Sequence, residues 1–83
     1  MYIVVVYDAD PHEREIIRAV LMPRLHWIQN SVFAGEINQV AAKDLQKSLT
    51  EYVRNSKVTF WLFDRKPETF QIGTQDDGES IFL

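Results

Sequence analysis

The chain has 83 residues, of which 46% are hydrophobic and 25% are charged, and its formal net charge is −3. This composition predicts one folded domain over residues 1–83 and argues against a disordered chain. The negative charge excludes nucleic-acid binding by bulk positive charge, and the absence of cysteine excludes disulfides and thiolate metal sites.

The small size of the domain favours self-association. A chain of this length buries only about 60% of the surface that its unfolded form exposes, so a second copy is a natural source of stability. No stretch approaches the roughly twenty apolar residues of a membrane span, and the first residues lack the charged segment of a signal peptide. We therefore expect a cytoplasmic protein that does not contact a membrane.

Residues 2–8 form an apolar and aromatic run that ends on a carboxylate, Asp8. A short run rich in β-branched and aromatic residues is typical of a central strand buried on both faces. The turn signal Ala9-Asp10-Pro11 follows at once. Asp8 therefore lies where a buried strand emerges, and it is either a turn or capping residue or a ligand for a cation.

A first helix is predicted to begin after Asp10, which can cap it. Pro11 suits the first helical position, and Glu13 stands where the partner in a capping box would be. Pro23 forbids continuation of the helix. The apolar face of this helix is formed by Ile16, Ile17, Val20 and Leu21.

Arg14 and Arg18 are four residues apart and lie on one exposed side of this helix. Two interpretations stay open: the arginines bind an anion such as phosphate, or Glu13 and Glu15 neutralise them. The remaining candidate basic positions are Arg24, Arg54, Lys57, Arg65 and Lys66.

Residues 25–37 predict a β-hairpin with Asn30-Ser31 as its turn. His26 has no second histidine or cysteine near it, which favours packing or surface exposure over a metal site. Asn38 can cap a second helix that ends before Asn55-Ser56. The apolar face predicted for this helix comprises Ala41, Leu45, Leu49, Tyr52 and Val53.

Residues 57–64 predict a strand covered by helices on one face, and residues 69–72 alternate as a half-buried strand that stops at Gly73. The tail, residues 74–83, is polar but ends in apolar residues 81–83. We expect this tail to dock on a sheet edge of the same chain or of a partner.

This order of elements predicts an α+β fold, the ferredoxin-like βαββαβ arrangement with an additional C-terminal strand. Both helices then cover one face of an antiparallel sheet. The other face carries aromatic side chains without a cover, which predicts a homodimer that packs sheet against sheet.

Two motifs together carry a family resemblance: the start of the chain, residues 1–8, and the run Gln-Asn-Ser-Val-Phe-Ala-Gly-Glu at residues 29–36. The chain resembles the small CRISPR-associated adaptation endonucleases, the second of the CRISPR-associated proteins. The resemblance implies a ferredoxin-like homodimer that works with the CRISPR integrase in spacer acquisition. It also implies a magnesium-dependent nuclease on RNA or double-stranded DNA.

Within this resemblance, Asp8 matches the strand-end aspartate that binds the metal and carries catalysis, and Ser31 and Phe33 match the hairpin motif. Arg14 and Arg18 are the expected nucleic-acid contacts. One carboxylate is too few to hold Mg²⁺, so two Asp8 side chains across a twofold axis are expected to share the ion. The chain differs from the family at Ala34, where an acidic residue is common.

Three functions follow as hypotheses. The first is a metal-dependent endonuclease that uses Asp8 and Mg²⁺. The second is a non-catalytic dimeric adaptor that bridges integrase subunits and nucleic acid, with the apolar tail adding a strand to a partner. The third is a toxin-type ribonuclease with the same ferredoxin-like fold.

Overall fold

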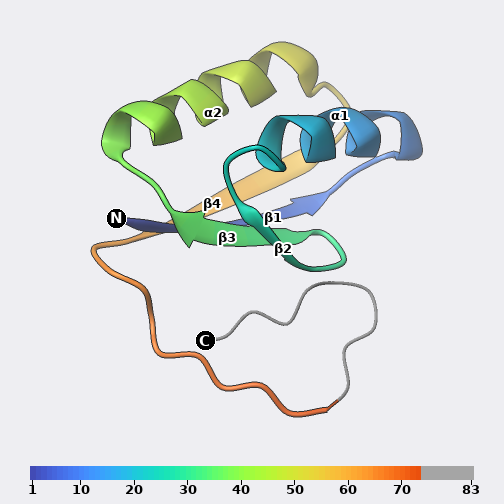
Figure 1. Cartoon of the computed structure of the whole chain (residues 1–83). Coiled ribbons are helices and arrows are strands. Elements are labelled where there is room, and N and C mark those ends of the chain that lie inside the picture. The colour runs from blue at the N-terminus through green and yellow to red at the C-terminus, as the bar shows by residue number, and fades with distance from the viewer. Residues whose placement is uncertain (74–83) are drawn as a thin grey trace.

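The strands form one antiparallel sheet in the order β2-β3-β1-β4, and both helices pack on the same face of this sheet (Figure 1). The structure, a computed structural model, describes residues 1–73. This arrangement confirms the predicted α+β ferredoxin-like fold. In chain order the elements are β1 (Tyr2–Asp8), α1 (Pro11–Leu21), β2 (His26–Gln29), β3 (Val32–Glu36), α2 (Gln39–Tyr52) and β4 (Lys57–Phe63).

β1 is the central strand, paired with β3 on one side and with β4 on the other. Ile3, Val5 and Tyr7 point to the helices and are buried. The prediction of burial on both faces is wrong at the carboxyl end of the strand, where Val6 and Asp8 are exposed because no helix covers them. We call the face away from the helices the open face; on β1 and β4 it comprises Tyr2, Val4, Val6, Asp8, Lys57, Thr59, Trp61 and Phe63.

Each helix begins at the side chain predicted to cap it. Asp10 Oδ1 accepts a hydrogen bond from the Glu13 backbone N–H at 2.7 Å, and Asn38 Oδ1 accepts one from the Ala41 N–H at 2.8 Å. These bonds satisfy N–H groups that have no partner within the first turn of a helix. The two helix starts are therefore local properties of the sequence.

The buried stripe of α2 differs from the predicted one. Ala42, Leu45 and Leu49 are buried, whereas Tyr52 is 53% exposed. At 3.6 residues per turn, Ala41 and Tyr52 lie on the flank of this stripe. Tyr52 instead lines a groove between α2 and the end of α1.

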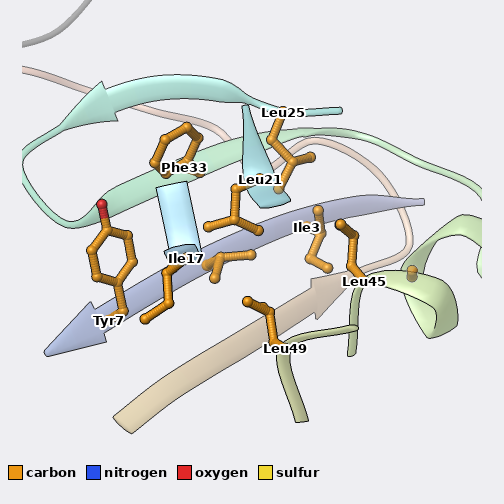
Figure 2. Close-up of a cluster of buried hydrophobic side chains, with 10 residues drawn as sticks. Ile3, Tyr7, Ile17, Leu21, Leu25, Phe33, Leu45 and Leu49 are labelled. Carbon is orange, nitrogen blue, oxygen red and sulfur yellow. The ribbon is translucent and has the colours of Figure 1, made fainter. Parts of the chain in front are cut away.

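The hydrophobic core lies between the sheet and the two helices (Figure 2). Phe33 is fully buried, and its ring stacks on Tyr7 with ring centroids 6.3 Å apart and planes at 29°. This contact joins β3 to β1 beneath α1. The other buried hydrophobic residues of the cluster are Ile3, Val5, Ile17, Leu21, Leu25, Ala42, Leu45 and Leu49.

Residues 64–73 leave β4 and run on the side of the open face without forming a strand (Figure 1). A cavity of about 230 Å³ is lined by Val4 and Ala34 from the sheet and by Pro67 and Phe70 from this segment. The strand predicted for residues 69–72 is therefore wrong, because the segment crosses the face instead of pairing with an edge. Phe70 is 86% exposed. The strand expected at the end of the tail lies outside the described residues.

Neither helix in the described part of the chain has the length and hydrophobicity needed to cross a membrane.

Candidate functional site

Asp8 is the last residue of β1 and lies at the end of the open face. Its side chain is exposed and shares that face with Val6, because side chains alternate along a strand. The capping interpretation of Asp8 is wrong, since Asp10 caps α1. The Asp8 carboxylate is therefore accessible to a ligand.

Lys57, the first residue of β4, is the antiparallel partner of Asp8. Directly opposed residues share a face, with their Cβ atoms about 5 Å apart. The sequence places Lys57 only among the candidate basic positions, since the register between two distant strands has no local signal. The structure adds an ammonium group to the Asp8 site.

Arg14 and Arg18 lie together on α1, in the helix layer, and both are half-buried. The Arg18 guanidinium carbon lies 5.0 Å from the ring centroid of Trp27, a cation–π contact. Burial raises the pKa of Tyr7 above its ordinary value of 10.0, and the positive charges of Arg18 and Arg14 act in the opposite direction. The arginines thus gather near the Tyr7 phenol, on the side of the sheet opposite to the Asp8 carboxylate.

Ser31 lies in the turn between β2 and β3, and Phe33 lies in the hydrophobic core. Ser31 adopts a φ of 68°, in the left-handed region, and its carbonyl accepts a hydrogen bond from the Tyr7 N–H at 3.0 Å. Phe33 stacks on the Tyr7 ring. Both residues of the motif therefore hold the hairpin against the central strand, one residue before Asp8.

Glu13 is the buried charged side chain of the described residues, with 4% of its surface exposed. Its carboxylate accepts hydrogen bonds from the Ser56 Oγ–H at 2.6 Å, from the Arg54 N–H at 2.8 Å and from the Asn55 N–H at 3.0 Å. Ser56 Oγ in turn accepts one from the Asp10 N–H at 3.2 Å. Half of the predicted capping box forms, since the Glu13 N–H donates to Asp10 Oδ1, but the other half is wrong because Ser56 and not Glu13 accepts the hydrogen bond from the Asp10 N–H.

The same donors act on the ionisation of Glu13. The Ser56 hydroxyl, followed by the Arg54 and Asn55 backbone N–H groups, holds the pKa of Glu13 below its ordinary value of 4.5, against the opposite effect of burial. The ionised carboxylate thus joins α1 to the loop before β4. No local pattern reveals this contact, since the loop lies more than forty residues further along the chain.

A single copy does not fit a magnesium ion. Within residues 1–73, no three histidine or acidic side chains come together as metal ligands. The Asp10 carboxylate caps α1 and the Glu13 carboxylate binds the loop before β4. Asp8 alone supplies fewer ligands than the six oxygens that magnesium prefers.

Comparison with known proteins places this geometry in a family. The sequence matches the family model described as CRISPR associated protein Cas2 over residues 1–68. The CRISPR-associated endoribonuclease Cas2 of Fusobacterium nucleatum is 34% identical over 92 residues, which covers 100% of this chain and 87% of that protein. The protein of the same name from Methanosarcina acetivorans is 28% identical over 78 residues, covering 94% of this chain and 88% of that protein.

Solved structures of Cas2 proteins have the same fold as this chain. A crystal structure of Cas2 matches this fold with a TM-score of 0.85 at 26% sequence identity, covering 100% of this chain and 98% of the other. The crystal structure of Streptococcus pyogenes Cas2 at pH 6.5 matches with a TM-score of 0.60 at 24% identity and covers 86% of this chain and 100% of the other, a likeness of fold. Because the family model spans the strands, both helices and the Asp8 site, this chain belongs to the Cas2 family of CRISPR-associated proteins.

Proposed function

We propose that this protein is a metal-dependent endonuclease that hydrolyses phosphodiester bonds of RNA or duplex DNA and acts in CRISPR adaptation with the integrase. The observation that carries the proposal is the exposed Asp8 carboxylate at the end of the central strand, beside the basic side chain of Lys57. The name endoribonuclease, which the curated relatives bear, supports nuclease chemistry.

The proposed active form is a homodimer joined through the open faces. Trp61 is 56% exposed on this face, and Phe70 and Ile72 of the adjoining segment are also exposed. Large apolar side chains on a sheet face without helices favour a second copy as the cover. A twofold axis near the end of β1 would bring the two Asp8 side chains together.

A magnesium ion fits this dimer better than it fits one copy. Two Asp8 carboxylates, phosphate oxygens of the substrate and water would complete an octahedral oxygen site. When bound, the ion would polarise a phosphoryl oxygen and lower the pKa of the attacking water. Asp8 would hold the ion.

Cleavage assays test this proposal. Wild type, Asp8→Asn and Asp44→Asn are each incubated with single-stranded RNA and with duplex DNA, in magnesium or in EDTA. Asp44 is an exposed carboxylate on α2 and serves as the matched control. We expect magnesium-dependent cleavage that Asp8→Asn abolishes and Asp44→Asn retains. Equal cleavage by wild type and Asp8→Asn would contradict the role of Asp8.

A second candidate is a non-catalytic dimeric adaptor that bridges integrase subunits and nucleic acid. Its support is the sparse chemistry of the site, since β1 and β4 contain no histidine and the described residues contain no cluster of metal ligands. Co-purification with the integrase tests it: truncation after Gly78 should weaken capture while the circular dichroism spectrum stays that of the wild type. Undiminished capture would contradict a role of the tail. Family membership offers no support for the toxin-type alternative.

A further inference from the structure

Asp8 and Lys57 form an isolated pair of opposite charges at one end of the open face. They are directly opposed in the β1–β4 ladder, and both side chains are exposed. Among the open-face residues of these two strands, Asp8 is the only acid and Lys57 is the only base. A polyanion that reaches the Asp8 carboxylate therefore also reaches the Lys57 ammonium group.

Arg54 and Arg18 are engaged elsewhere. Arg54 Nη1 donates to the carbonyl oxygens of Thr50 and Val53, at 3.2 and 3.1 Å, and so closes the end of α2. Arg18 lies over Trp27 in the helix layer. Within residues 1–73 no hydrogen bond joins the Lys57 ammonium group to another residue, so its donors are available to a ligand.

The position of Lys57 is fixed from the side of α1. The Glu13 carboxylate binds the Ser56 hydroxyl and the Arg54 and Asn55 N–H groups, which belong to the three residues that precede Lys57. The Ser56 hydroxyl oxygen also accepts a hydrogen bond from the N–H of Asp10, which lies two residues after Asp8. One network thus holds the end of β1 and the start of β4 together.

We propose that Lys57 binds a phosphate of the nucleic-acid backbone beside Asp8, and that Glu13 is the positioning residue for Lys57. The inference rests on the proposed function, since it names a further contact of the same site. A lone carboxylate repels a phosphodiester, whereas a compact ammonium group beside it offsets the negative charge and donates to phosphate oxygens. The phosphodiester is common to RNA and DNA, so both are substrates of the test.

Salt dependence of binding separates a phosphate contact from a cross-strand ion pair that only supports the sheet. Each neutralised phosphate contributes about 0.9 to the slope of log K against log salt on duplex DNA and about 0.7 on a single strand. A lysine that binds phosphate changes this slope when it is removed. A lysine that only pairs with Asp8 leaves the slope unchanged.

The experiment measures the affinity of wild type, Lys57→Gln, Lys57→Arg and Lys43→Gln for single-stranded RNA and for duplex DNA of the same sequence, in EDTA, over a range of salt. Lys43 is an exposed lysine of α2 and serves as the matched control. We expect Lys57→Gln to weaken binding roughly 3- to 10-fold and to reduce the slope by about 0.7 to 0.9 for each phosphate that Lys57 neutralises. Lys57→Arg should restore the slope, and Lys43→Gln should leave it unchanged.

The outcomes distinguish this inference from the proposed nuclease. If the wild type binds and cleaves, and the salt slope of Lys57→Gln equals that of the wild type, the role of Lys57 is overturned and the nuclease proposal stands. If the wild type binds without cleaving, and the salt slope is reduced in Lys57→Gln, the phosphate contact of Lys57 is supported and the nuclease proposal is overturned. A wild type that binds neither nucleic acid in EDTA overturns the role of Lys57, and the magnesium-dependent cleavage assay then decides the nuclease by itself. The nucleic acid whose slope changes identifies which backbone occupies the site.

A double-mutant cycle tests the positioning role of Glu13. Glu13→Gln, and the milder Ser56→Ala, should weaken nucleic-acid binding in the wild type but add nothing in the Lys57→Gln background, because residues that act as a unit are non-additive. Circular dichroism at the assay temperature establishes that each variant is folded. Equal reductions of affinity in the two backgrounds for both variants would overturn the positioning role of Glu13.

Discussion

The Ser56 hydroxyl donates to the Glu13 carboxylate at 2.6 Å, across a sequence separation of 43 residues. This bond joins the first turn of α1 to the loop that leads into β4. It lies at the same end of the sheet as Asp8 and Lys57, the pair with opposite charges. One buried carboxylate therefore connects α1 to the residues that precede Lys57.

Replacement of this carboxylate by an amide should destabilise the protein. In Glu13→Gln the amide keeps one oxygen acceptor and replaces the other oxygen by an NH2 donor, so it cannot accept all the hydrogen bonds that Ser56, Arg54 and Asn55 donate to the carboxylate. We expect the Tm at neutral pH to fall by about 5 °C or more. Glu15→Gln, an exposed position on the same helix, is the control and should change the Tm by less than half as much. Equal falls in thermal melts of the two variants would contradict the prediction.

The stability should also depend on pH through Glu13. Its pKa in the folded state lies below the ordinary 4.5 because the ionised form accepts the Ser56, Arg54 and Asn55 hydrogen bonds. A group whose pKa is lower in the folded state than in the unfolded state stabilises the protein at pH values above its unfolded-state pKa. This stabilisation disappears as the pH falls through the folded-state pKa. The difference in stability between wild type and Glu13→Gln should thus be constant above about pH 5 and shrink below pH 4.5. Urea titrations at several pH values measure it; a difference that grows on acidification would contradict this sign.

Trp27 should stabilise the helix layer through Arg18. A cation over an indole ring contributes about 0.5 to 1 kcal/mol when it is partly exposed. A double-mutant cycle of Trp27→Leu and Arg18→Gln should therefore give a coupling energy of about that size in urea unfolding. A coupling energy of zero, with both variants folded, would show that the contact in the structure contributes nothing to stability.

The helix starts and the hairpin were predictable because their signals are local. Asp10 with Pro11 starts α1, Asn38 starts α2, and the Asn30-Ser31 turn lies between two strand-like runs. In each case a side chain or a turn acts on backbone within four residues. The order of these elements was then sufficient to predict the ferredoxin-like fold.

The failures concern contacts between distant parts of the chain. The alternation of residues 69–72 resembles a strand, but alternation does not say whether a segment pairs with an edge or crosses a face. Asp8 is predicted as the site from its place at a strand end together with the family resemblance. Its partner Lys57 and the role of Glu13 depend on strand register and on the loop before β4, neither of which leaves a periodic pattern.

The proposed dimer gives a prediction about Trp61. This side chain is 56% exposed on the open face of β4, so replacement by glutamate should cost the isolated fold little but should place two like charges in a sheet-to-sheet interface. We expect wild type to elute as a dimer and Trp61→Glu as a monomer in size-exclusion chromatography with light scattering. Val40→Glu, which adds the same charge to an exposed position of α2, should remain a dimer. A dimeric Trp61→Glu with the dissociation constant of the wild type would place the interface elsewhere, because the charge cannot be buried between two open faces without cost.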